Sequence, residues 1–212
     1  MLAAAAALAA IATSTTQRLS LLLTLGAVVP VVLGVELHHR RQTVAGFVAV
    51  VVGLAGGGGA LAFLVTRTGS FSLSLELIPG LLGLFVLAFG FGPAWKNDTR
   101  LLISAGTGLV LVSVITSLGV YETDTTGVLV GGIATILAWD LGEQAVNIGE
   151  QIGREAATTR VELVHGGVTA GVGVLAVGGV LVVRSFDVTG VPLTGLAGLL
   201  GAGLMLTLAL YN

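Results

Sequence analysis

Long runs of apolar residues recur along the whole chain, and most are long enough to cross a lipid bilayer as an α-helix. A helix rises about 1.5 Å per residue, so roughly 17–25 apolar residues span the hydrocarbon. Within lipid the backbone has no water to bond to, and a helix satisfies its peptide groups within one segment. The pattern therefore predicts an all-α, polytopic transmembrane bundle of about eight helices, with seven as the alternative, in one domain over residues 1–212. The predicted segments are 2–16, 19–35, 43–65, 75–95, 101–120, 127–145, 161–183 and 191–210.

The amino-acid composition also indicates a lipid environment. Hydrophobic residues make up 55% of the chain and charged residues only 9%, whereas a soluble domain carries roughly a quarter charged residues. So few charges cannot cover a surface that faces water, and lipid is the expected solvent. The net charge of −2 argues against a nucleic-acid partner. Since there is no Cys, disulfides, thiolate chemistry and Cys-based metal sites are excluded.

Segment 2–16 is the least secure of the eight, because it is short and rich in Ala. A secretory signal peptide is the alternative interpretation of this segment. Such a peptide has a basic region before its apolar stretch, and no basic residue precedes Leu2. We therefore expect the segment to be part of the folded protein.

The basic residues predict the orientation, because cytoplasmic loops carry an excess of Lys and Arg. If all eight segments cross and the N-terminus is inside, six of the nine basic residues lie on the cytoplasmic side. The loop at 121–126 is acidic and falls outside. We therefore expect a cell-membrane protein with both termini cytoplasmic. The inside residues are Arg40, Arg41, Lys96, Arg100, Arg154 and Arg160, and the outside residues are Arg18, Arg67 and Arg184.

A polar stripe is predicted near the end of the sixth segment. Its members recur at spacings of three and four residues, which places them on one face of a helix. We therefore expect the sixth span to continue into the cytoplasm as an amphipathic helix over residues 140–160. The stripe consists of Asp140, Glu143, Asn147, Glu150 and Arg154.

Several uses of this stripe are open. It can dock a soluble protein, it can line a vestibule in which Asp140, Glu143 and Glu150 carry protons or cations, or it can be a solvated connection between two spans. An intramembrane active site with Glu143, Glu150 and His165 is the fourth alternative. No zinc-binding H-E-x-x-H motif or G-x-S-x-G motif occurs, and no nucleophile, base and orienting group are assembled. We therefore expect no catalytic, cofactor-binding or metal-binding residues.

Glycine occurs 33 times, mostly within the apolar runs. Helices in lipid associate through close contact between small residues, and several glycines have the small-xxx-small spacing that permits it. The run at 56–59 is either a break in its span or a packing surface, and packing is favoured because Gly is common in spanning helices. The spaced pairs are Gly53 with Gly57, Gly127 with Gly131, Gly167 with Gly171, and Gly198 with Ala202.

The run W-D-L-G-E-Q, followed by G-R-E and R-V-E-L-V-H, covers Trp139–His165. It resembles a motif of uncharacterised haloarchaeal multi-pass membrane proteins. Genes of that family tend to lie beside those of MoxR-type AAA ATPases and von Willebrand-factor-like proteins. The resemblance implies a membrane component of a chaperone-like or envelope-assembly system. One Lys against eight Arg is also typical of GC-rich genomes, such as those of actinobacteria or halophilic archaea.

The sequence thus predicts a non-enzymatic membrane subunit or scaffold whose cytoplasmic polar face engages a protein partner. The alternative is a small transporter or channel that uses its carboxylates. Membrane lipids are expected partners, and a homo-oligomer is left open. The candidate partner-binding residues are Asp140, Glu143, Asn147, Glu150, Arg154 and His165.

Overall fold

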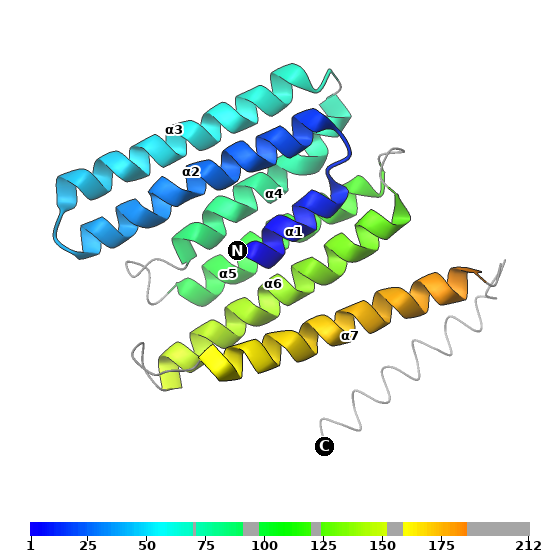
Figure 1. Ribbon diagram of the computed structural model, residues 1–212. Helices are drawn as coiled ribbons and strands as arrows, with labels where there is room; N and C mark the ends of the chain where they lie inside the picture. Colours follow the sequence, from blue (N-terminus) through cyan, green and yellow to red (C-terminus); the bar gives the residue numbers. More distant parts are fainter. Residues whose placement is uncertain (70, 91–97, 120–123, 152–158, 186–212) are drawn as a thin grey trace. The chain divides into compact units, whose positions relative to one another are not determined.

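The computed structural model describes residues 1–69, 71–90, 98–119, 124–151 and 159–185, and every regular element in these ranges is an α-helix. The chain divides into two compact units, Met1–Gly173 and Val174–Asn212. The predicted eighth segment, 191–210, lies outside the described residues. The seven helices (Figure 1) are α1 Leu2–Ile11, α2 Thr15–His39, α3 Thr43–Arg67, α4 Phe71–Gly90, α5 Thr99–Ser117, α6 Thr125–Gln151 and α7 Thr159–Ser185.

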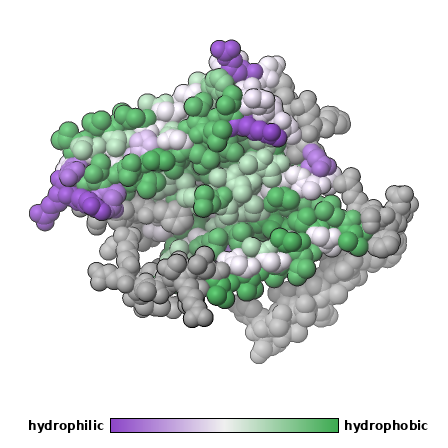
Figure 2. All heavy atoms as spheres, viewed as in Figure 1, coloured by the Kyte–Doolittle hydropathy of each residue, from purple (hydrophilic) through white to green (hydrophobic). Residues whose placement is uncertain are grey.

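Four of these helices, α2, α3, α5 and α6, are long and apolar enough to cross a membrane. Their outward faces carry large apolar side chains, and Phe47 and Val44 of α3 are 69% and 79% exposed. Figure 2 shows apolar residues over the face formed by α2 and α3, with hydrophilic residues gathered toward the helix ends. Contiguous apolar surface of this kind is rare on soluble monomers. The fold is therefore that of a helical, membrane-embedded protein.

Within the unit Met1–Gly173, the most extensive contacts join α2 with α3 and α4 with α5. The helices α2 and α3 form one hairpin, α4 and α5 form another, and α6 packs on α5. The two hairpins meet where α4 contacts α2 and α3. The turn between α2 and α3, the start of α5 and the end of α6 consequently lie at one end of this unit, which we call the basic end. The starts of α2 and α4 and the end of α5 lie at the opposite end.

The helix α1 is short and packs with one face against the bundle, in front of α4 and α5 in Figure 1, while Leu2, Ala6 and Ala9 on it are exposed. It contacts α6, α5, α2 and α4, and four of its ten residues, Ala4, Ala7, Leu8 and Ile11, are fully buried. Ten residues extend about 15 Å, or half of the hydrocarbon thickness. Segment 2–16 is thus a short core helix followed by the start of α2, and α1 alone is too short to cross.

Ser14 and Gln17 determine where α2 begins. The Ser14 hydroxyl accepts a hydrogen bond from the Gln17 backbone N–H at 3.2 Å, and the Gln17 side-chain oxygen accepts one from the Ser14 N–H at 3.1 Å. This reciprocal pair is a capping box, which satisfies backbone donors that the first turn of a helix leaves unpaired. The chain can therefore reverse direction within three residues after α1.

The contact between α2 and α3 depends on glycine. A Cβ atom on Gly46 would lie 2.7 Å from the carbonyl oxygen of Gly34, and one on Gly53 would lie 2.6 Å from that of Ala27. Gly57 packs against the ring of Phe85 on α4. The helix α3 continues without interruption through residues 56–59, so the run is not a break. Gly56 and Gly57 pack against Ala27 and Phe85, whereas a Cβ on Gly58 or Gly59 would meet nothing within 4 Å among the described residues.

The other predicted glycine pairs give a mixed result. Gly131 packs closely, since a Cβ there would lie 3.2 Å from the carbonyl oxygen of Ala7. At Gly167 and Gly171 a Cβ would meet nothing within 4 Å among the residues that the structure describes, so packing at this pair stays a prediction. Gly198 and Ala202 lie outside the described residues.

Candidate functional site

The polar stripe begins on the last turns of α6. This helix runs unbroken for 27 residues, because no Pro interrupts it. Asp140, Glu143 and Asn147 therefore occupy successive turns of one face, as their spacing predicts. All three face neighbouring helices closely enough to form hydrogen bonds or an ion pair.

Arg100, in the first turn of α5, joins two members of the stripe. Its Nε atom lies 3.4 Å from Oε2 of Glu143, and its Nη2 atom donates a hydrogen bond of 2.7 Å to Oδ1 of Asn147. The side chain of Arg100 is 52% exposed and that of Glu143 is 21% exposed. A planar guanidinium can hold two acceptors at once, so Arg100 fixes the start of α5 against the end of α6.

Asp140 lies one turn deeper and contacts the next helix. Its Oδ2 atom accepts a hydrogen bond of 2.9 Å from the Thr169 hydroxyl on α7. Nearby, a Cβ on Gly166 of α7 would lie 3.0 Å from the Leu141 side chain. The described part of the stripe therefore links α6 to α5 and to α7. We call these five residues, Arg100, Asp140, Glu143, Asn147 and Thr169, the polar seam.

The remaining predicted site residues lie outside the description. The side chains of Glu150, in α6, and His165, in α7, are not described, and neither is any part of Arg154. The predicted contact between Glu150 and Arg154 and the role of His165 stay predictions.

The chemistry available at the polar seam is binding by charge and hydrogen bonding. Asn147 is exposed and Arg100 is half exposed, so both can reach a partner from the basic end. In the ranges that the structure describes, no three His, Asp or Glu side chains are placed to hold a metal ion. The expectation of a protein without metal, cofactor or catalytic residues stays a prediction.

Two residues of the polar seam were missed in the sequence. Arg100 was used only as a marker of orientation, and Thr169 was assigned to an apolar span. The signal for Arg100 was present, because a basic residue that starts one helix lies at the same end as a carboxylate that ends the next antiparallel helix. No such signal identifies Thr169, since its pairing depends on the register between α6 and α7.

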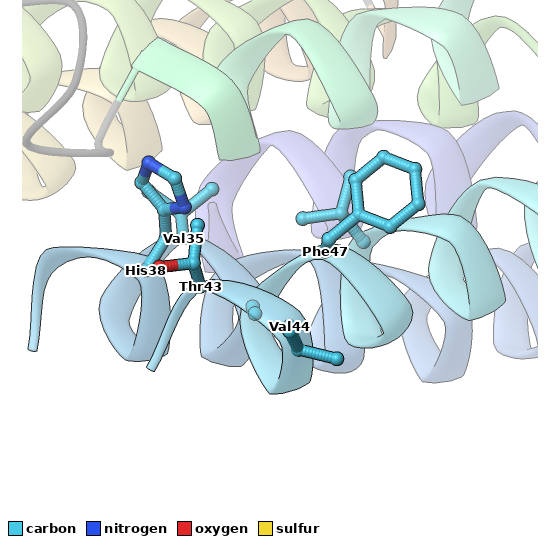
Figure 3. A pocket seen from close by; sticks show the side chains of 8 residues that line it. Val35, His38, Thr43, Val44 and Phe47 are labelled. Carbon is cyan, nitrogen blue, oxygen red and sulfur yellow. The ribbon is translucent and has the colours of Figure 1, made fainter. Parts of the chain in front are cut away.

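A pocket of about 430 Å³ lies at the basic end, between the end of α2 and the start of α3. Figure 3 shows Val35, His38, Thr43, Val44 and Phe47 around it. The remaining lining residues are Gly34, Gly46 and Val50. Ligand sites combine apolar walls with a few convergent polar groups, and this pocket has an almost entirely apolar wall. It does not share a residue with the polar seam.

The comparisons with known proteins give a family and no activity. The model of a family of unknown function (DUF7519) matches residues 52–207. No curated protein and no solved structure matches the chain.

Proposed function

The chain belongs to the family of unknown function DUF7519, and we propose that it is a non-enzymatic, multi-pass membrane subunit whose basic end engages a protein partner. The observation that carries this proposal is the polar seam. It joins α5, α6 and α7 through Arg100, Asp140 and Glu143 while Asn147 remains exposed beside them. A rigid, partly exposed set of polar groups is suited to recognition, because its side chains are already ordered before the partner binds.

The orientation follows from the distribution of charge. The basic end carries Arg40, Arg41 and Arg100, whereas Arg18 and Arg67 lie at the opposite end. The positive-inside rule therefore favours a cytoplasmic basic end. We keep eight helices, with 191–210 as the last, and a cytoplasmic C-terminus. The proposal that the N-terminus is cytoplasmic has no support from α1, which is too short to reach the basic end alone.

The length of α6 supports the proposed cytoplasmic extension. Its 27 residues extend about 40 Å, whereas the hydrocarbon of a bilayer is about 30 Å thick. The surplus of roughly two turns is enough to carry Asn147 beyond the hydrocarbon on the cytoplasmic side. An amphipathic helix over 140–160 is the continuation that we propose.

The resemblance of Trp139–His165 to haloarchaeal membrane proteins supports one partner over others. We propose a MoxR-type AAA ATPase, or a protein that acts with one, as the soluble component. This part of the proposal and the archaeal, halophilic origin rest on the resemblance and on the preference for Arg over Lys. A homo-oligomer is compatible with the same surface.

The transporter alternative has less support at this site. Carriers of ions need carboxylates that face a water-filled path, whereas Asp140 and Glu143 are bonded to residues of neighbouring helices. The stripe is thus better suited to keeping neighbouring helices in a fixed arrangement at a binding surface than to conducting ions.

The direct test is binding of the purified full-length protein, in lipid nanodiscs, to the MoxR-type ATPase of the same genome. We expect the triple variant D140N/E143Q/E150Q to bind at least tenfold more weakly, which corresponds to about 1.4 kcal/mol. The matched control is Glu36→Gln. Glu36 forms an exposed ion pair of 2.8 Å with Arg40 at the same end, but outside the polar seam, so this variant should bind normally.

Equal binding by the triple variant and the control would rule out the stripe as the docking surface. Complete absence of binding by the unchanged protein would rule out this class of partner. Loss of binding in both variants would mean that any carboxylate at the basic end matters, and the polar seam would have no special role.

A further inference from the structure

A second polar region lies at the opposite end, around a carboxylate that the sequence analysis did not single out. Glu76, in α4, is 1% exposed although most of its helix is apolar. It lies sixth in α4, about 8 Å along the axis from the first residue. An ionisable residue inside a transmembrane bundle is costly to keep there, and such residues usually face the interior and mark a functional site.

Gln17 of α2 is held in position to contact this carboxylate. Its Oε1 atom accepts hydrogen bonds from the Thr13 N–H, the Thr13 hydroxyl and the Ser14 N–H, at 2.9, 3.3 and 3.1 Å. The opposite side of the amide is thereby turned toward α4, and its Nε2 atom donates to Oε2 of Glu76 at 3.3 Å. The cap of α2 thus also orients a donor toward Glu76.

The helix α4 is locally rearranged beside Glu76. Pro79 has no N–H to donate within the helix, and the helix contains this residue three positions after Glu76. The carbonyl oxygen of Glu76 accepts a hydrogen bond of 3.3 Å from the Thr116 hydroxyl, and the N–H of Gly80 donates to the Ser113 hydroxyl at 2.6 Å. Two hydroxyl groups of α5 therefore form hydrogen bonds with backbone groups of α4 close to the buried carboxylate.

Two hydroxyls on the same face of α2 have no hydrogen-bond partner among the described residues. Ser20 and Thr24 follow Gln17 at spacings of three and four, and both are 0% exposed. Other threonine hydroxyls donate to a carbonyl oxygen of their own helix, and the Thr107 hydroxyl donates to that of Ile103 at 2.7 Å. Ser20 and Thr24 do not. Buried polar groups are almost always paired with protein or with ordered water, and internal waters typically occupy such positions.

We propose that Glu76 is the centre of a hydrated proton-binding site between α2 and α4. Water that is bonded to the hydroxyls of Ser20 and Thr24 connects with the carboxylate. A proton from bulk solvent is relayed through this water to a carboxylate oxygen of Glu76, so that the water stays neutral and Glu76 becomes a neutral carboxylic acid. The proton returns to bulk solvent by the same water when the site deprotonates. Gln17 is a positioning residue, because its amide orients the carboxyl group in both states.

Two arginines of the helices packed against α4 lie at the same end of this unit as Glu76. At the same end, Arg18 and Arg67 are exposed, and the Nε atom of Arg18 donates to the carbonyl oxygen of Ala12 at 3.1 Å. The other described titratable side chains of these helices are Glu36, His38 and Arg100, which lie toward the basic end.

The test is infrared difference spectroscopy of the full-length protein in lipid, recorded between acidic and alkaline pH. We expect a carboxylic-acid C=O band that grows on acidification, shifts in D₂O and is absent from Glu76→Gln. The matched control Glu36→Gln removes an exposed carboxylate and should keep the band. A band that persists in Glu76→Gln, or a Glu76 signal that does not change with pH, would overturn the proposal.

A second pair of variants keeps the carboxylate in place. Thr24→Val removes a hydroxyl assigned to the water, and we expect it to shift the frequency of the Glu76 band. Thr107→Val removes a buried hydroxyl that bonds to its own helix and should leave the frequency unchanged. Identical spectra for the two variants would contradict the part assigned to Thr24 and, with it, the hydrated site.

Discussion

At the residue scale, hydroxyl groups hold α4 and α5 together where α4 contains Pro79. The Ser113 hydroxyl accepts a hydrogen bond from the N–H of Gly80, and the single hydroxyl hydrogen of Thr116 is shared between the carbonyl oxygens of Val112, at 2.9 Å, and Glu76, at 3.3 Å. A proline within a spanning helix is tolerated when neighbouring hydroxyls re-satisfy the freed backbone groups. These two side chains therefore have a structural role that their polarity alone does not reveal.

Replacing Ser113 with Ala should destabilise the protein by about 1–3 kcal/mol, because it leaves the buried Gly80 N–H without this acceptor. The measurement is thermal or denaturant unfolding in detergent, together with the rate of amide hydrogen exchange at Gly80. Ser104 lies on the exposed side of the same helix, and Ser104→Ala should change stability by no more than about 0.5 kcal/mol. Comparable losses in the two variants would contradict the role assigned to Ser113.

At the element scale, the apolar runs predicted the long helices well. The run at 43–65 became α3 at 43–67, and the run at 161–183 became α7 at 159–185. The helix α6 reaches Gln151, beyond the predicted end of the sixth span at residue 145, and the amphipathic helix over 140–160 stays a prediction. The first segment was the least accurate, because Ala-rich residues suit either a span or a core helix, and only the tertiary contacts of α1 distinguish them.

The candidate site was less predictable than the helices. Helical spacing placed Asp140, Glu143 and Asn147 on one face, which the structure confirms. Helical spacing could not show that Arg100 of α5 and Thr169 of α7 contact that face. Contacts between helices depend on their register and rotation, which hydropathy does not encode. Glu76 did have a signal, since it is a single carboxylate within an apolar run.

The glycine contact between α2 and α3 allows a matched test at this scale. Gly53→Ala would place a Cβ atom 2.6 Å from the carbonyl oxygen of Ala27 and 2.9 Å from the backbone nitrogen of Val31. We expect a loss of about 1–3 kcal/mol from overpacking, measured by unfolding in detergent. Gly58→Ala meets nothing within 4 Å and should be neutral or slightly stabilising, since Ala favours helix over Gly. Equal destabilisation would show that helix propensity, and not contact with α2, governs these positions.

At the scale of the whole molecule, the two ends have different chemistry. The basic end contains the polar seam and an excess of Arg. The opposite end contains the buried carboxylate of Glu76, which contacts Gln17 in the cap of α2. If the apolar helices cross a bilayer in the orientation that we propose, the first of these regions faces the cytoplasm and the second lies near the external surface. A partner bound at the polar seam and a proton bound at Glu76 would then reach the protein from opposite sides of the membrane.

The crossing itself can be measured with single cysteines, because the natural chain contains none. Gln42, in the turn between α2 and α3, is exposed and makes no side-chain cap, and Leu118, at the end of α5, is 65% exposed. In sealed, right-side-out vesicles we expect a membrane-impermeant maleimide to label Leu118→Cys and to label Gln42→Cys only after the vesicles are opened. Labelling of both cysteines in sealed vesicles would contradict a protein that crosses the membrane between these two positions.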